Sequence, residues 1–184
     1  MSKSWQPFER NLTKLRGETN LTSYAYLFVE MVKYAEDKSG NIDEIHSKLA
    51  DFGCHVGVRL LDLVFLRDKQ FKRETKLKSL LLYIKGPFWK AIYSKEIEDL
   101  ERAVDNDNTY YLMEREPVVN KYISVPKDKS SLNCAAFNGG IIEAILNSCG
   151  FDCKVTTVWY KGTAYIIKFE DFVITRDKQI DGGR

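Results

Sequence analysis

The chain has 184 residues, of which 44% are apolar and 29% charged, and its net charge is only +2. This composition is that of an ordinary soluble globular protein with room for one sizeable core. No apolar run approaches the roughly 20 residues of a membrane-spanning helix, and the N-terminus has no apolar signal region. We therefore expect neither an integral membrane protein nor a secreted one, but a cytosolic chain with reduced cysteines.

The chain is expected to form a polar N-terminal arm over 1–20, one domain over 21–175 and a fraying polar tail over 176–184. The first helix of the domain is predicted to be capped by Thr22 or Ser23 and to reach about Lys38. Its apolar residues cover an arc of roughly 220°, whereas a surface helix of a monomer needs only about 100°. Either this helix is enclosed within the domain, or its outer side docks on another protein.

The second helix, predicted over 41–67, is the element around which the domain is organised. Asn41 and Glu44 have the spacing of a helix-capping box. Gly53 and Gly57 lie four residues apart beside its apolar stripe, and each costs a helix interior about 1 kcal/mol. We therefore expect another backbone to approach closely there. The second half of the helix is so apolar that we expect it to be buried nearly all round.

The segment 67–95 is strongly basic, with nine basic and two acidic residues, a difference of +7. A third helix is predicted to start near Glu74 and to be interrupted at Gly86-Pro87. Its lysines predict either a solvated helix face or a basic surface that docks on an acidic partner or an anionic membrane.

In the second half of the chain the period of the apolar residues changes, and strands are expected as well as helices. The expected elements are a short polar helix over 95–104, strands over 109–113 and 118–125, a helix from Ser130 or Ser131 to Cys149, and strands over 153–160 and 163–170 joined at Lys161-Gly162. This order predicts an α+β fold in which a helical layer is packed on a four-stranded antiparallel β-sheet.

Candidate catalytic groups are few. Cys54 and His55 are adjacent in a helix and point about 100° apart, so they do not form a nucleophile–base pair. Glu114 and Glu116 have the spacing of an acid–base pair on one strand face, although their neighbours favour a solvated turn. No phosphate loop, dinucleotide fingerprint or metal-ligand spacing occurs, so no catalytic residue, metal or cofactor is expected. An assembly subunit or a module that holds an apolar ligand remains.

Several motifs, in order, resemble those of one known family. The run GVRLLD at 57–62 and RET at 73–75 resemble the Bet-type small subunits of the TRAPP complexes. Five further motifs resemble the subunit 5 branch of this family: EREP at 114–117, YISVPK at 122–127, SLNCA at 131–135, KGT at 161–163 and IKFE at 167–170. The resemblance spans about residues 20–178, nearly the whole chain.

The resemblance implies a non-catalytic scaffold subunit. TRAPP complexes tether vesicles travelling from the endoplasmic reticulum to the cis-Golgi and exchange nucleotide on a Rab-type GTPase. The implied partners are a Bet-type subunit, bound through the first two helices as a heterodimer, and a sedlin-like subunit at the other end. The implied interface residues on the first helix are Tyr24, Phe28, Met31 and Val32.

The acylated member of the family carries a fatty chain on a cysteine just before its RET motif, whereas residues 68–72 of this chain, DKQFK, contain no cysteine. We therefore expect an unacylated protein. The alternative function is a small-molecule or lipid-binding module of the same fold. Its apolar cavity would lie behind Leu60, Leu63, Leu81 and Ile84.

Overall fold

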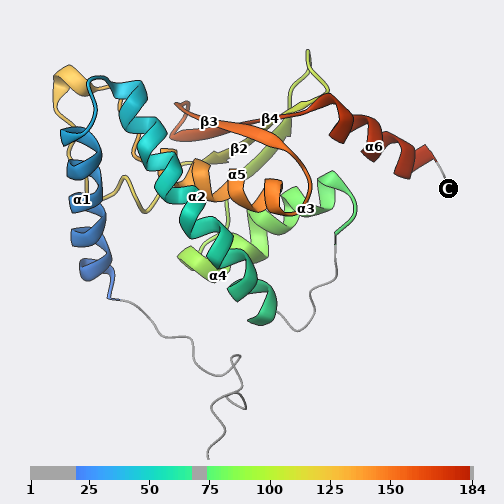
Figure 1. The fold of residues 1–184 in the computed structure, drawn as a ribbon, viewed down its shortest axis with the longest axis horizontal. Helices are drawn as coiled ribbons and strands as arrows, with labels where there is room; N and C mark the ends of the chain where they lie inside the picture. Colours follow the sequence, from blue (N-terminus) through green and yellow to red (C-terminus); the bar gives the residue numbers. More distant parts are fainter. Residues whose placement is uncertain (1–19, 68–73, 183–184) are drawn as a thin grey trace, which may run out of the picture.

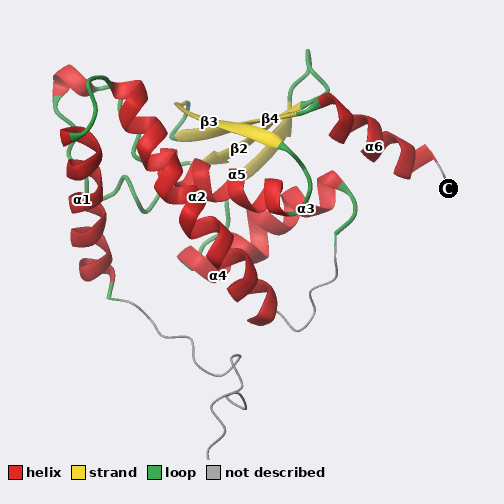
Figure 2. Ribbon diagram, in the orientation of Figure 1, coloured by secondary structure: helices red, strands yellow, loops and turns green. Residues whose placement is uncertain are grey.

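The computed structural model describes residues 20–67 and 74–182. It is an α+β fold in which helices cover one face of a four-stranded antiparallel sheet, as predicted (Figures 1 and 2). The helices are α1 (Leu21–Asp37), α2 (Ile42–Arg67), α3 (Leu77–Tyr83), α4 (Trp89–Tyr93), α5 (Ala136–Ser148) and α6 (Asp171–Gly182), with a π turn η3 (Ile84–Phe88) and a 3-10 turn η4 (Lys127–Lys129). The strands are β1 (Asp99–Arg102), β2 (Thr109–Glu114), β3 (Cys153–Trp159) and β4 (Thr163–Phe169), in the sheet order β1-β2-β4-β3.

Two of the sequence-based assignments in the middle of the chain are wrong. The polar segment expected as a helix over 95–104 contains strand β1, which pairs with β2 because β2 offers it an open edge. The segment expected as a strand over 118–125 forms turns, in which the amide of Asn120 donates to the carbonyl oxygen of Pro117. Its β-branched residues are used differently: Val119 is buried in the core, so tertiary packing overrides strand propensity.

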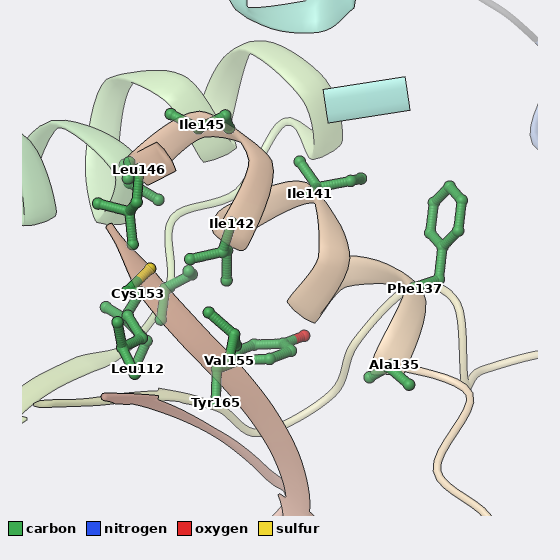
Figure 3. Packing of buried hydrophobic residues seen from close by; sticks show 14 of the residues in the cluster. Leu112, Ala135, Phe137, Ile141, Ile142, Ile145, Leu146, Cys153, Val155 and Tyr165 are labelled. Carbon is green, nitrogen blue, oxygen red and sulfur yellow. The ribbon is translucent and has the colours of Figure 1, made fainter. Parts of the chain in front are cut away.

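Helix α5 is the centre of the core, between α2 and the sheet. Its side chains Ile142 and Leu146 point toward Leu112, Val155 and Tyr165 of the strands (Figure 3). The helix begins at Ala136, later than predicted, and ends before Gly150, which has a φ of +80°. The glycine terminates the helix because it adopts this left-handed conformation without steric cost.

The glycines of α2 and α5 permit the close contact that the sequence predicts. A Cβ atom built on Gly53 would lie 1.9 Å from the carbonyl oxygen of Phe137, and one on Gly140 would lie 1.9 Å from that of Ala50. Since real Cβ atoms do not approach so closely, only glycine allows these two helices to cross at this distance. The expectation of a close backbone approach at Gly53 is confirmed.

The expectation that the second half of α2 is enclosed is wrong. Leu61 and Val64 are buried, but Val58 is 50% exposed and Arg59 is also exposed. Helix α5 covers only one side of α2, which leaves the opposite side open among the described residues.

The third helical segment is continuous through its proline. Its apolar residues Leu77, Leu80, Leu81 and Ile84 are all at most 1% exposed. The helix begins at Leu77 rather than near Glu74, and Gly86-Pro87 does not end it. The π turn η3 includes Pro87 and carries the helix into α4, because a wider turn accommodates a residue without an amide hydrogen.

The ends of the domain also differ from expectation. Helix α1 is capped by Asn20, whose Oδ1 accepts from the amide of Thr22 at 2.9 Å, rather than by Thr22 or Ser23. Residues 171–182 form α6, where a fraying tail was expected over 176–184, because Val173 and Ile174 are buried and Asp177 accepts from the amide of Leu77. The arm over 1–19 and the segment 68–73 lie outside the described residues, within which no helix is long and apolar enough to cross a membrane.

Candidate docking surface on the first two helices

Helix α1 uses its wide apolar arc in both of the ways considered from the sequence. One side packs on the core: Phe28 is 3% exposed and its ring meets that of Phe137 edge-on at 5.3 Å. The other side carries Leu27 and Tyr34, which are 61% and 55% exposed. One part of the apolar arc of α1 is therefore buried in the core, and another part forms an open apolar surface.

This open surface is hollowed. Helices α1 and α2 meet at their connection and diverge from it (Figure 1). Between them lies an open cavity of about 320 Å³ lined by Leu27, Glu30, Met31 and Tyr34 of α1 and by Phe52 of α2. We call these five residues the α1–α2 groove. Glu30 is the only charged group of the lining, and its carboxylate pairs with Lys33 at 2.7 Å on the solvent side.

Three interactions hold α1 and α2 in place around the groove. The rings of Tyr34 and Phe52 lie 6.1 Å apart, which joins the two helices across the groove. At the connection between the two helices, Asn41 Oδ1 accepts from the amide of Glu44 at 2.9 Å, which caps α2 as predicted. An ion pair between Glu36 and Lys129 ties the end of α1 to η4. The groove is thus a preformed feature of the chain.

The four residues proposed from the sequence as interface residues fall into different environments. Phe28 and Val32 are buried in the core of this chain, so they present no surface to a partner. Tyr24 is half-buried and packs beside Phe28, with ring centroids 6.2 Å apart. Met31 lines the groove.

The exposed groove residues Leu27 and Tyr34 were missed, as was Phe52 on α2. A signal for them existed in the sequence. Leu27, Met31 and Tyr34 have the spacing i, i+4 and i+7 of one helix face, at the edge of the arc opposite to the buried residues.

The residues considered for catalysis are engaged in structural contacts. The carboxylate of Glu114 is buried and accepts from Trp89 Nε1 at 3.3 Å and from the Tyr165 hydroxyl at 2.8 Å, and it pairs with Lys95 at 2.7 Å. Glu116 is exposed, so the two carboxylates do not share an acid–base site. Glu114 is a buried charge with its partners supplied by the protein, which is the arrangement that a stable interior requires.

The thiols and histidines are also accounted for by local contacts. The thiol of Cys54 donates to the carbonyl oxygen of Gly140 at 3.3 Å, and burial raises its pKa. The ring of His55 contacts its own helix at the carbonyl of Asp51. His46 is half-buried, and its Nε2 accepts from the amide of Asn133 at 2.9 Å. Within the described ranges, no group of His, Cys, Asp and Glu residues is arranged to hold a metal ion.

The residues behind which an apolar cavity was expected are not among those that line the groove. Leu81 and Ile84 are completely buried, and Leu60 and Leu63 of α2 are half-buried. The segment 68–72, on which the acylation argument depends, lies outside the described residues.

Comparison with known proteins defines the class. Residues 24–170 match the family model described as transport protein particle (TRAPP) component, so the chain belongs to the TRAPP component family, whose members are subunits of a vesicle-trafficking complex. Relatives include the trafficking protein particle complex subunit 5 of Gallus gallus, 51% identical over 95% of this chain and 93% of that protein. The Homo sapiens and Dictyostelium discoideum subunits 5 are 47% and 43% identical and cover 95% and 92% of this chain.

A solved structure supports the fold independently. The crystal structure of a trafficking protein particle complex subunit 3 from Naegleria fowleri, covalently bound to palmitic acid, is similar to this chain with a TM-score of 0.73. The similarity covers 83% of this chain and 96% of that one, at 13% sequence identity. The helical layer and antiparallel sheet are therefore the fold of the family.

Proposed function

We propose that this protein is a non-catalytic structural subunit of a TRAPP complex that tethers vesicles and promotes nucleotide exchange on a Rab-type GTPase in transport from the endoplasmic reticulum to the Golgi. Membership of the TRAPP family supports this proposal, as does the high identity to subunit 5 proteins. In this proposal the chain acts in the cytoplasm, at the surface of the cis-Golgi and the endoplasmic reticulum. The GTPase is engaged by the assembled complex.

The observation that carries the scaffold role is the α1–α2 groove. Leu27 and Tyr34 expose more than half of their surface beside the half-buried Met31 and Phe52. A contiguous apolar hollow of this kind is costly in water and is typical of a surface that is covered by another protein. The partner we propose is a Bet-type TRAPP subunit, which would insert apolar side chains of a helix between α1 and α2. A sedlin-like subunit is proposed to bind elsewhere on the chain.

Co-expression with a Bet-type subunit tests this pairing. The two chains should elute together from size-exclusion chromatography at micromolar concentration. Leu27→Asp should release the partner, because it places a carboxylate in the apolar groove. Val104→Asp, at a position that is 98% exposed and remote from the groove, is the control and should keep the complex intact. Separate elution of the unmodified chains would refute the proposed pairing.

The alternative function is a small-molecule or lipid-binding module. The complete burial of Leu81 and Ile84 favours a packed core over a ligand tunnel at that position. We propose that the protein is unacylated, and that it needs no cofactor. Intact-mass spectrometry of the protein from its native source should give the mass of the unmodified polypeptide, and a palmitoyl addition would contradict this.

A peripheral membrane contact is a second candidate role. On α3, Lys78 is exposed beside Leu82, which is 49% exposed. A basic residue near an anionic bilayer contributes about 1 kcal/mol, and an apolar neighbour adds to it. Liposome flotation should be weakened by Lys78→Glu, whereas flotation that is insensitive to this charge reversal would remove the role.

A further inference from the structure

The sheet has a second face, turned away from the helices, with an apolar centre. In the strand register, Met113 lies opposite Ala164, which lies opposite Val158, and Tyr111 lies opposite Ile166. Directly opposed residues share one face of a sheet, so these five side chains are neighbours. Ala164 is 3% exposed and the other four are half-buried, and the exposed Thr156 lies on the same face opposite Ile166. The alternating residues Leu112, Tyr165 and Ile167 are completely buried in the core on the other side of the sheet. We call Tyr111, Met113, Val158, Ala164 and Ile166 the outer sheet face.

This apolar character requires an explanation. An antiparallel sheet with one face in water normally alternates apolar residues inside with polar residues outside. Here β2 and β4 place Tyr111, Met113 and Ile166 outside, while the buried Glu114 is inside. Helices α2, α4 and α5 all lie on the opposite side of the sheet (Figure 1). Such a face is typical of a protein contact surface.

Charged residues flank the outer sheet face at two diagonally opposite corners. Asp99 and Glu101 of the edge strand β1 lie opposite Met113 and Tyr111, so they border the face with negative charge. Lys168 and Lys154 are paired with each other in the register at the far end of β4 and β3, and both are exposed. Lys154 also meets Glu143 at 3.0 Å along the sheet edge.

We propose that the outer sheet face binds a second copy of this chain. Neighbouring strands are about 4.8 Å apart, and alternate residues along a strand about 6.8 Å apart. On this grid, a twofold axis in the plane of the face, crossing between Tyr111 and Ile166, brings Glu101 onto Lys168 of the partner subunit. The same operation brings Asp99 onto Lys154 of the partner subunit. The face is therefore complementary to itself in charge, which is the requirement of a twofold interface.

The arrangement agrees with known sheet packing. The axis crosses the strands diagonally, so the two sheets pack nearly at right angles, which is one of the two common geometries for packed sheets. A four-stranded face is smaller than a standard stable interface, so the dimer is of the weak, micromolar kind. The α1–α2 groove belongs to the helical layer and stays available, so the dimer joins two copies without competing for the partner proposed for the groove.

A charge-exchange experiment on the full chain tests this contact. Sedimentation equilibrium should show a monomer–dimer equilibrium that weakens as salt is added. Glu101→Lys and Lys168→Glu should each weaken dimerisation roughly tenfold, because each opposes like charges twice across the twofold axis. An equimolar mixture of the two variants should restore dimerisation as a heterodimer, since each then meets the opposite charge. Both positions are exposed, so we expect the fold to tolerate the change.

Several results would overturn the inference. A monomeric unmodified chain at all concentrations would do so, as would a mixture of the two variants that stays monomeric. Dimerisation that is lost with Leu27→Asp and kept with Glu101→Lys would assign self-association to the groove. If Glu101→Lys instead released a different subunit from a reconstituted TRAPP complex, the outer sheet face would bind that subunit and not a second copy of this chain. The groove-dependent pairing is measured separately, so its failure and the failure of this dimer are distinguishable.

Discussion

The hydroxyl of Tyr165 on β4 donates a 2.8 Å hydrogen bond to the carboxylate of Glu114 on β2, and both residues are at most 1% exposed. This bond belongs to a chain of buried polar contacts. Asn138 Nδ2 donates to the same hydroxyl at 3.2 Å, and the Tyr93 hydroxyl donates to Asn138 Oδ1 at 2.7 Å. Burial raises the pKa of both tyrosines, so they stay protonated and act as donors. This series of buried hydrogen bonds joins the sheet to α5 and α4 in one specific arrangement.

Removal of the central carboxylate should therefore destabilise the protein strongly. Glu114→Ala leaves the Tyr165 hydroxyl and the indole of Trp89 without their acceptor in a buried site. We expect the free energy of unfolding to fall by about 3 kcal/mol. Urea denaturation measures this change. Glu116→Ala, at an exposed position, should cost no more than about 0.5 kcal/mol. Equal effects of the two substitutions would contradict the structural role of Glu114.

A methyl group at the crossing of α2 and α5 should be poorly tolerated. The Cβ of Gly140→Ala would lie 1.9 Å from the carbonyl oxygen of Ala50, and this backbone atom moves only if the helices separate. We expect a loss of about 3 kcal/mol in stability, measured by thermal or urea unfolding. Gly40→Ala is the matched control, because its nearest neighbour is the flexible Glu44 carboxylate at 3.8 Å. Unchanged stability of Gly140→Ala would refute this packing.

The stability of the protein should depend on His46 in mildly acidic solution. Burial lowers the pKa of His46 below its usual 6.5, and its Nε2 accepts a hydrogen bond from Asn133 only when the ring is neutral. The unfolded chain therefore binds a proton more readily than the folded one, so this contribution to stability is present above about pH 6.5 and is lost as the pH falls. His46→Gln should flatten the pH dependence of urea unfolding between about pH 7 and 5. The exposed His55→Gln should leave that dependence as it is in the unmodified protein.

The buried cysteines should resist alkylation in the folded protein. Burial raises the pKa of the Cys134 thiol to about 12, and burial also raises that of Cys153. Since the thiolate is the reactive form, neither residue should react with iodoacetamide at about pH 8 until the protein is unfolded. Mass spectrometry of alkylated peptides, with and without denaturant, measures this. Rapid labelling of Cys134 in the folded protein would show that the core around α5 opens readily.

The sequence by itself determined the elements with strong local signals. The capping pair Asn41 and Glu44 defined the start of α2, and the Lys161-Gly162 turn defined the β3–β4 hairpin, because both residues adopt positive φ there. Gly53 predicted the close approach of another backbone, which the fold shows to be that of α5. The order of the predicted helices and strands was sufficient to indicate the fold class. The motifs indicated the family, which the comparisons confirm.

Only the tertiary structure decided which side of each element faces the core. Phe28 and Leu27 are neighbours with similar hydrophobicity, yet one is buried and the other exposed, because α5 packs on only one side of α1. The 99–102 segment became a strand, and 118–125 became turns, because long-range pairing with β2 and burial of Val119 outweigh local propensity. A helical period in the sequence indicates that a helix has an apolar face. Which part of the molecule packs on that face depends on residues distant in sequence, and only the fold brings those residues together.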